Sequence, residues 1–186
     1  MSVLQMLWLP ILLSSVFVFV VSFILNAALP WHKRDYGKVP DEDRVMDALR
    51  PFGLPPGDYM LPRCNSAAES KTPEFMEKVK KGPVMIFTVA PNGPFDMGKS
   101  LVLWFLYLLV VGFFTAFVSR HALSYPATHR QICGFAGITA ALAYSGALWQ
   151  MSIWYRRSWC TTIKFAIDGV IYAGITAATF AWLWPR

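Results

Sequence analysis

The stretch from Ile163 to Trp184, IKFAIDGVIYAGITAATFAWLW, decides the fold of this chain. Its length of about twenty mostly apolar residues is that of a helix that crosses a bilayer. One acid, Asp168, interrupts the run, and Lys164 precedes it by one helical turn. A carboxylate inside a bilayer is costly unless it faces protein, water or an opposite charge. The stretch therefore predicts a membrane-spanning helix with at least one protein neighbour.

A helical wheel gives this predicted helix two protein-facing sides. One side is polar and the other carries small residues, while bulky apolar residues remain for lipid. We therefore expect this helix to be the central packing element of a bundle. The polar side holds Asp168, Tyr172, Thr176 and Thr179, the small side Gly169, Ala173, Ala177 and Ala181, and the lipid side Ile167, Ile171 and Trp182.

The composition of the 186-residue chain places it in the membrane class. Hydrophobic residues make up 55% of it, and its mean hydropathy is +0.42. The net charge of +6 does not come from residues 30–97, where basic and acidic residues are equal in number. The excess lies near the ends of the apolar runs, where basic residues set orientation. This distribution argues against nucleic acid as a partner.

Three further apolar runs predict three further spans, so the fold class is an all-α membrane protein with four transmembrane helices. A small α+β extramembrane insert lies between helices 1 and 2. The run at the N-terminus has no preceding Lys or Arg and no cleavage site of small residues, so we expect an uncleaved span. The predicted spans are 3–29, 98–119, 131–152 and 162–184, with the insert at 30–97.

The insert holds most of the chain's 13 prolines, which rules out one long helix. Asp41 is the predicted cap of a helix over 41–50. Thr72 and Pro73 predict the start of a second helix over 73–81, which Gly82 ends. Strands are expected near 58–61 and 84–89. The segment is too short and polar for a sizeable core of its own, so we expect it to dock on the membrane domain or on a partner.

Basic residues near the span ends favour one orientation, with the insert in the cytoplasm and both termini in the periplasm. The side of the membrane that holds the insert has the larger number of basic residues near the span ends. They are Lys33, Arg34, Lys38, Lys99, Arg156, Arg157 and Lys164, against Arg120, Arg130 and Arg186 on the other side.

Asp168 and Lys164, with Tyr172 and Thr176, form the first candidate site, an intramembrane polar site. In a functional interpretation Asp168 handles a proton or cation, and Tyr172 and Thr176 extend a hydrogen-bonded path. In a structural interpretation Lys164 neutralises Asp168 at i,i+4, and the acid holds a neighbouring helix. The structural interpretation is favoured, because no other predicted span has an ionisable residue in its middle.

Basic and aromatic residues at span ends form the second candidate site, for an anionic lipid head group or a quinone head. The alternative, which is favoured, is an interfacial tryptophan followed by orientation charges. The residues are Trp31, His32, Lys33, Arg34, Arg156 and Arg157.

The sequence contains no recognisable catalytic or metal-binding motif. Cys64, Cys133 and Cys160 are too widely spaced for a metal or haem motif, and we expect free thiols. His32 lies on the opposite membrane face from the predicted loop that holds His121 and His129, so these side chains cannot meet at one ion. We therefore expect no enzyme activity, metal or cofactor.

The segment at the exit of the first span resembles stretches of small bacterial integral membrane proteins. The resemblance covers about thirty residues and implies a bacterial inner-membrane protein, but no activity or site residue can be transferred from it. It rests on LPWHKRDY at 29–36, PDED at 40–43, ALRP at 48–51 and PPGDY at 55–59.

Two functions of different classes follow. The first is a non-catalytic accessory or scaffold subunit of a larger bacterial inner-membrane complex, with respiratory and photosynthetic electron-transfer complexes as the class considered. Its partners would be membrane lipids and other protein subunits. The alternative is a small oligomeric transporter or channel subunit that uses Asp168 for a proton or cation. A lipid- or quinone-processing enzyme built on His32 and Arg156 is a weaker third hypothesis.

Overall fold

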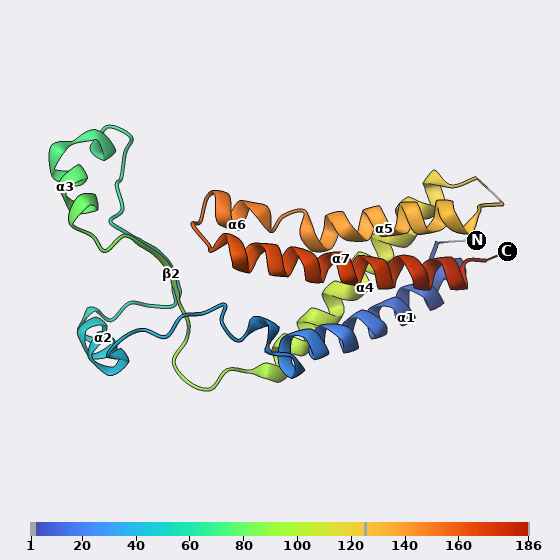
Figure 1. Ribbon diagram of the computed structural model, residues 1–186, viewed down its shortest axis with the longest axis horizontal. Coiled ribbons are helices and arrows are strands. Elements are labelled where there is room, and N and C mark those ends of the chain that lie inside the picture. The colour runs from blue at the N-terminus through green and yellow to red at the C-terminus, as the bar shows by residue number, and fades with distance from the viewer. Residues whose placement is uncertain (1–2, 125, 186) are drawn as a thin grey trace. The chain divides into compact units, whose positions relative to one another are not determined.

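The computed structural model describes residues 3–124 and 126–185 and is mostly helical (Figure 1). Four of its helices are long and apolar enough to cross a membrane, which confirms that prediction. The chain divides into a membrane unit, up to Tyr36 and from Asp96 onward, and an insert, Gly37–Phe95. The membrane unit holds α1 (Val3–Phe23), α4 (Met97–Ala122), α5 (His129–Ser145), the short α6 (Trp149–Ile153) and α7 (Trp159–Leu183).

Helix α7 has the central place that its residue pattern predicts. It packs against both α1 and α5, and it is the most buried of the four long helices. All eight residues of the predicted polar and small sides are buried. Ile167, Ile171 and Trp182 are exposed, as expected for side chains that face lipid.

Small residues let α5 and α7 approach closely. The Cα of Gly137 faces Ala177, so that an added Cβ would lie 3.3 Å from the alanine methyl group. At Gly169 an added Cβ would lie 2.2 Å from Ser145 Oγ. That hydroxyl donates a hydrogen bond to the Ala166 carbonyl at 3.1 Å. The two helices therefore form a tight pair because side chains are missing where they touch.

Helix α1 departs from regular geometry at two places. Leu7 has non-helical angles (φ −122°, ψ 15°) three residues before Pro10, whose ring and missing N–H disturb the preceding turn. At its other end α1 continues as a π-helix, η1 (Ile24–Ala28). Its contact with α4 is close, because an added Cβ on Gly112 would lie 3.2 Å from Ile11 Cγ2.

The apolar core of the membrane unit has two clusters along the bundle. One contains Leu7, Ile11, Ala116, Leu123, Ile132, Ala136, Phe180 and Ala181. The other contains Val18, Leu108, Val111, Ala140, Tyr144, Tyr172 and Ala173.

The insert is built on a two-stranded antiparallel sheet, β1 (Gly57–Leu61) and β2 (Met85–Val89), with Tyr59 opposite Phe87. Helix α3 (Pro73–Lys81) begins as predicted, because Thr72 Oγ1 accepts a hydrogen bond from the Phe75 N–H. Helix α2 (Glu42–Leu49) begins directly after Asp41, as predicted, but without a side-chain cap. Asp41 has φ 51° and its side chain accepts no capping bond, so the predicted Asp41 cap is wrong.

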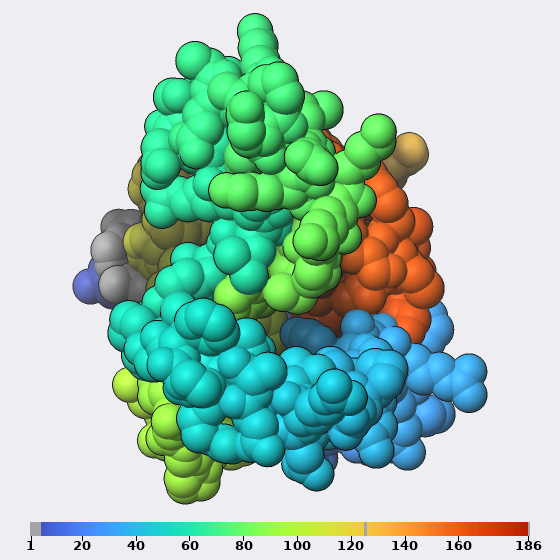
Figure 2. All heavy atoms as spheres, turned by 90° about the vertical axis from the view of Figure 1, so that its left-hand side faces the viewer, coloured from blue at the N-terminus to red at the C-terminus, as the bar shows by residue number. Residues whose placement is uncertain are grey.

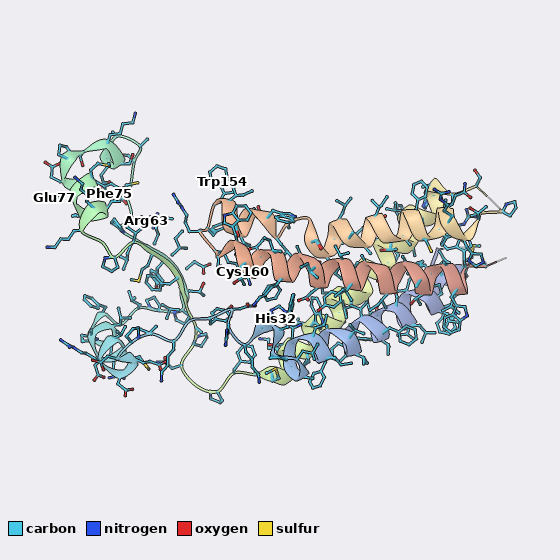
Figure 3. The ribbon with its side chains drawn as sticks, in the orientation of Figure 1. His32, Arg63, Phe75, Glu77, Trp154 and Cys160 are labelled. Atoms are coloured by element: carbon cyan, nitrogen blue, oxygen red, sulfur yellow. The ribbon has the colours of Figure 1, made fainter. Side chains whose placement is uncertain are left out.

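No residue of the insert is buried, although the structure describes all of Gly37–Phe95. Figure 2 shows its atoms, in cyan and green, spread over lobes rather than gathered around a centre. The labelled Arg63, Phe75 and Glu77 belong to the lobe of α3 (Figure 3). This unit therefore has defined short helices and a two-stranded sheet but no buried core, and many of its apolar side chains are exposed.

Candidate functional site

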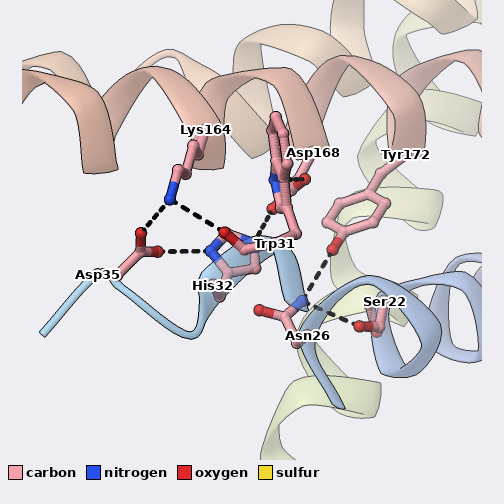
Figure 4. Close-up of polar contacts among 8 residues, drawn as sticks. All are labelled: Ser22, Asn26, Trp31, His32, Asp35, Lys164, Asp168 and Tyr172. Carbon is pink, nitrogen blue, oxygen red and sulfur yellow. Dashed lines mark hydrogen bonds and ion pairs between the residues drawn. The ribbon is translucent and has the colours of Figure 1, made fainter. Parts of the chain in front are cut away.

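The site begins where the chain leaves η1. Leu29 is extended, and Pro30–His32 forms one turn of 3-10 helix, η2, whose Pro30 carbonyl accepts from the Lys33 N–H at 3.3 Å. Proline suits the first position of such a turn, because its φ is already set and its missing N–H has no partner to lose. The turn carries the side chains of Trp31 and His32 to the first turns of α7 (Figure 4).

Asp168 is the buried centre of these contacts, with 2% of its surface exposed. Trp31 Nε1 donates a hydrogen bond to its Oδ1 at 3.1 Å. His32 Nε2 lies 2.7 Å from its Oδ2. Both carboxylate oxygens thus have a partner from the segment that follows the first span, which lowers the cost of burying the acid.

His32 connects Asp168 to a second carboxylate. Its Nδ1 lies 2.6 Å from Asp35 Oδ2, and Lys164 Nζ lies 2.7 Å from Asp35 Oδ1. Lys164 Nζ also donates to the Trp31 carbonyl at 3.0 Å. Trp31, His32, Asp35, Lys164 and Asp168 form one connected set, which we call the exit network.

The geometry of His32 constrains the number of protons in the exit network. Each of the two short N···O contacts needs a proton between its atoms, whereas a neutral imidazole carries only one N–H. An imidazolium donates to both carboxylates at once. With His32 protonated, the positive charges of His32 and Lys164 balance the negative charges of the two carboxylates. Buried charged groups need such pairing.

Asp35 lies outside the spanning helices, with 3% of its side chain exposed. Burial raises the pKa of its carboxyl, but the hydrogen bonds and positive charges of Lys164 and His32 outweigh burial. The result is a pKa lowered from the ordinary value of 3.8. Asp35 is therefore ionised in the folded protein under all but strongly acidic conditions.

The predicted ion pair between Lys164 and Asp168 is wrong. Spacing at i,i+4 brings two side chains to one face of a helix. The Lys164 ammonium instead turns to Asp35, and Asp168 takes its partners from Trp31 and His32. A carboxylate brought close by the chain fold competes successfully with the one next in the helix.

The structure brings together parts of both predicted sites. Trp31 and His32, from the head-group site, meet Lys164 and Asp168, from the intramembrane site. His32 also packs on Phe165, with ring centroids 4.6 Å apart, and the Arg157 guanidinium lies 4.5 Å from the same ring. Figure 3 shows His32, Trp154 and Cys160 towards one end of the membrane unit.

Lys33, Arg34, Arg156 and Arg157 of the predicted head-group site do not join the exit network. Lys33, Arg34 and Arg156 are exposed, and Arg156 has a positive φ of 59°. The six residues are therefore not one pocket. Trp31 and His32 contact Asp168 of α7, Arg157 lies over the Phe165 ring, and the other three are surface charges.

Tyr172 and Thr176 do not continue a path from Asp168. The Thr176 hydroxyl donates to the Tyr172 carbonyl one turn back, at 2.9 Å. The Tyr172 hydroxyl instead accepts from Asn26 Nδ2 at 3.4 Å, and Asn26 also donates to the Ser22 carbonyl. Ser22 Oγ accepts from Trp104 Nε1 at 2.9 Å. These contacts join α1, η1, α4 and α7 beside the exit network.

The sequence assigned Asn26 to no site, and it gave Asp35, which lies in the run at 31–36 after the first span, no partner. An acid among basic residues just after a span is a usable signal, because it needs a nearby cation. The π-helical turn that places Asn26 leaves no comparable mark in the sequence, although such turns recur at functional sites.

Within residues 3–124 and 126–185, no group of three or more His, Cys, Asp or Glu side chains is arranged to hold a metal ion. The three cysteines are free thiols. Comparison of the chain with models of protein families, with curated proteins and with solved structures found no match.

Proposed function

We propose that this protein is a non-catalytic accessory or scaffold subunit of a larger bacterial inner-membrane complex, of the kind that includes electron-transfer complexes. The observation that carries the proposal is the insert, whose elements are defined but whose apolar side chains are uncovered. On α2, Val45, Met46 and Leu49 are each at least 40% exposed, and Phe52, just after it, is 72% exposed. Apolar side chains gathered on one face of a segment outside the membrane are typical of a surface that another protein covers.

The exit network supports a structural role for the intramembrane acid. Both oxygens of Asp168 are engaged by Trp31 and His32, and the network is neutral when His32 is protonated. A transported cation that Asp168 coordinates directly would have to displace these partners. A scaffold needs them in place, because they fix the segment from which the insert leaves.

A transporter or channel subunit is the second candidate function. The observation in its favour is that Asp168, His32, Asp35 and Lys164 form a continuous chain of ionisable groups. Proton relays are built from such chains. Asp168→Asn separates the candidates, since a transporter loses flux while it still assembles, whereas a scaffold shows no flux that depends on this carboxylate.

The orientation belongs to the same proposal. We infer a cytoplasmic insert and periplasmic termini, because basic residues are concentrated at the span ends next to the insert. Reporter fusions placed in the insert and at each terminus test this, and an insert reporter active only in the periplasm would contradict it.

Purification from native membranes in mild detergent, with quantitative mass spectrometry, tests the scaffold proposal. We expect other membrane subunits at a fixed ratio to this chain. Replacing Met46 and Leu49 by Gln should reduce that ratio, because the pair lies on the apolar side of α2. Replacing Asp43 and Arg44 by Gln is the matched control on the same helix and should preserve it. Recovery of this chain alone, or only with copies of itself, would overturn the proposal.

A further inference from the structure

A cavity of about 980 Å³, open on one side, is formed by the membrane unit next to Asp168 of the exit network. Its walls come from all four long helices, and it falls within the size range of small-molecule sites, roughly 300–1,000 Å³. Phe19, Phe23, Leu101 and Leu103 belong to the apolar lining, and Asp168 is also a lining residue.

One wall of this cavity is a closed circuit of four aromatic rings. Trp104 stacks on Tyr107 with centroids 5.5 Å apart, and Tyr107 meets Tyr144 at 6.2 Å. Tyr144 meets Tyr172 edge to face at 5.7 Å, and Tyr172 returns to Trp104 at 6.2 Å. We call these four residues the aromatic wall. All four line the cavity.

The charges around the cavity have one sign. Among the residues that the structure describes as lining it, Asp168 is the charged one, and no Lys or Arg takes part. His32, the ion-pair partner of Asp168, is not a lining residue, and neither is Lys164. An anionic head group such as a phosphate or a carboxylate would therefore meet a carboxylate and no cation, which disfavours it.

Aromatic faces next to a carboxylate attract a different class of ligand. Trp is the strongest cation–π partner among side chains, followed by Tyr and Phe, and the attraction grows when water is excluded. Asp168 has partners on both oxygens, and among the lining side chains that the structure describes its carboxylate is the one that carries a charge. A cation without N–H groups can use both features without displacing Trp31 or His32.

We propose that this cavity binds an amphipathic organic cation, with its charged centre between Asp168 and the aromatic wall and its apolar groups against Phe19, Phe23 and Leu101. The site is separate from the surface of the insert on which the scaffold proposal rests. Either proposal can therefore fail while the other stands.

Two probes of nearly the same size and shape, but opposite charge, test the charge requirement. Tetraphenylphosphonium should bind the purified full-length chain in detergent saturably, at one per chain, as measured by equilibrium dialysis. Tetraphenylborate should bind at least about tenfold more weakly. Equal binding of the two probes, or no saturable binding of tetraphenylphosphonium, would overturn the proposal.

Variants locate the site. Trp104→Leu should weaken tetraphenylphosphonium binding about tenfold. Trp8→Leu makes the same chemical change at an exposed position of α1 away from the cavity and should leave binding unchanged. Asp168→Asn should also weaken binding of tetraphenylphosphonium. Because Asp168→Asn also disturbs the exit network, the comparison of Trp104 with Trp8 decides: equal affinity in these two variants would place the ligand elsewhere and overturn the assignment.

Discussion

At the scale of single residues, the exit network depends on contacts between groups far apart in the sequence. Sequence reasoning identified Asp168 as the anomalous residue and favoured a structural role for it, but gave it the wrong partner. Spacing within one helix can be read from the sequence, whereas the approach of Asp35 to Lys164 depends on how the chain returns after the first span. Residues 31–35 could be recognised as a cluster, but not as partners of α7.

The hydrogen bond from Trp31 to Asp168 gives the first residue-scale prediction. Trp31→Phe keeps an aromatic ring but removes the N–H that reaches Oδ1. We expect a loss of about 1.5–3 kcal/mol in the free energy of unfolding, because the acceptor is charged and buried. Trp154→Phe, at a side chain that is 74% exposed, is the control and should change little. Unfolding in mixed detergent measures both, and equal stability of the two variants would contradict the contact.

Asp35 gives a prediction about acid. Its pKa is lower in the folded chain than the ordinary value of 3.8, so the unfolded chain takes up a proton first as the pH falls. The stabilisation is complete above the unfolded pKa and is lost as the pH falls through the folded pKa. The wild type should therefore lose more stability between neutral and strongly acidic pH than Asp35→Asn. Asp43→Asn, at an exposed acid of α2, is the control and should behave as the wild type does. An unchanged acid profile in Asp35→Asn would refute this role.

At the scale of elements, the lengths and apolar faces of the spanning helices follow from the sequence, because burial of backbone groups in a bilayer allows few alternatives. The sides assigned to α7 are confirmed residue by residue. Local signals were less uniform: Thr72 caps α3, but Asp41 adopts a left-handed backbone and caps nothing. The π-helical end of α1 could not be predicted, because no residue pattern in Ile24–Ala28 marks such a turn.

The close contact of α5 with α7 is tested by a pair of glycines on α7. Gly169→Ala would place a methyl group 2.2 Å from Ser145 Oγ and 3.2 Å from the Tyr144 backbone, so the Ser145 hydroxyl must leave its bond to the Ala166 carbonyl or the helices must shift apart. We expect a loss of about 1–3 kcal/mol in the free energy of unfolding. At Gly174, nothing lies within 4 Å of an added Cβ, so Gly174→Ala should change stability by no more than about 1 kcal/mol. If the two variants unfold alike, the helices are not held at this contact.

At the scale of the whole molecule, the chain combines a packed membrane unit with an insert that buries none of its own residues. The absence of a sizeable core in residues 30–97 could be predicted from their length, polarity and prolines. The sequence could not show that the acid of the last span is held by the exit of the first. The contact between His32, just after the first span, and Asp168, in the last span, joins segments that are far apart in the sequence. The inference that Asp168 has a structural role rests on this contact.

A double-mutant cycle between His32 and Asp168 tests that link most directly. The free energy of unfolding in detergent is measured for the wild type, His32→Ala, Asp168→Ala and the double variant. Because the groups are in contact at 2.7 Å and each is left buried without its partner in a single variant, we predict a coupling of about 1–3 kcal/mol. Effects that add within about 0.5 kcal/mol would contradict the exit network and remove the structural reason for preferring a scaffold over a transporter.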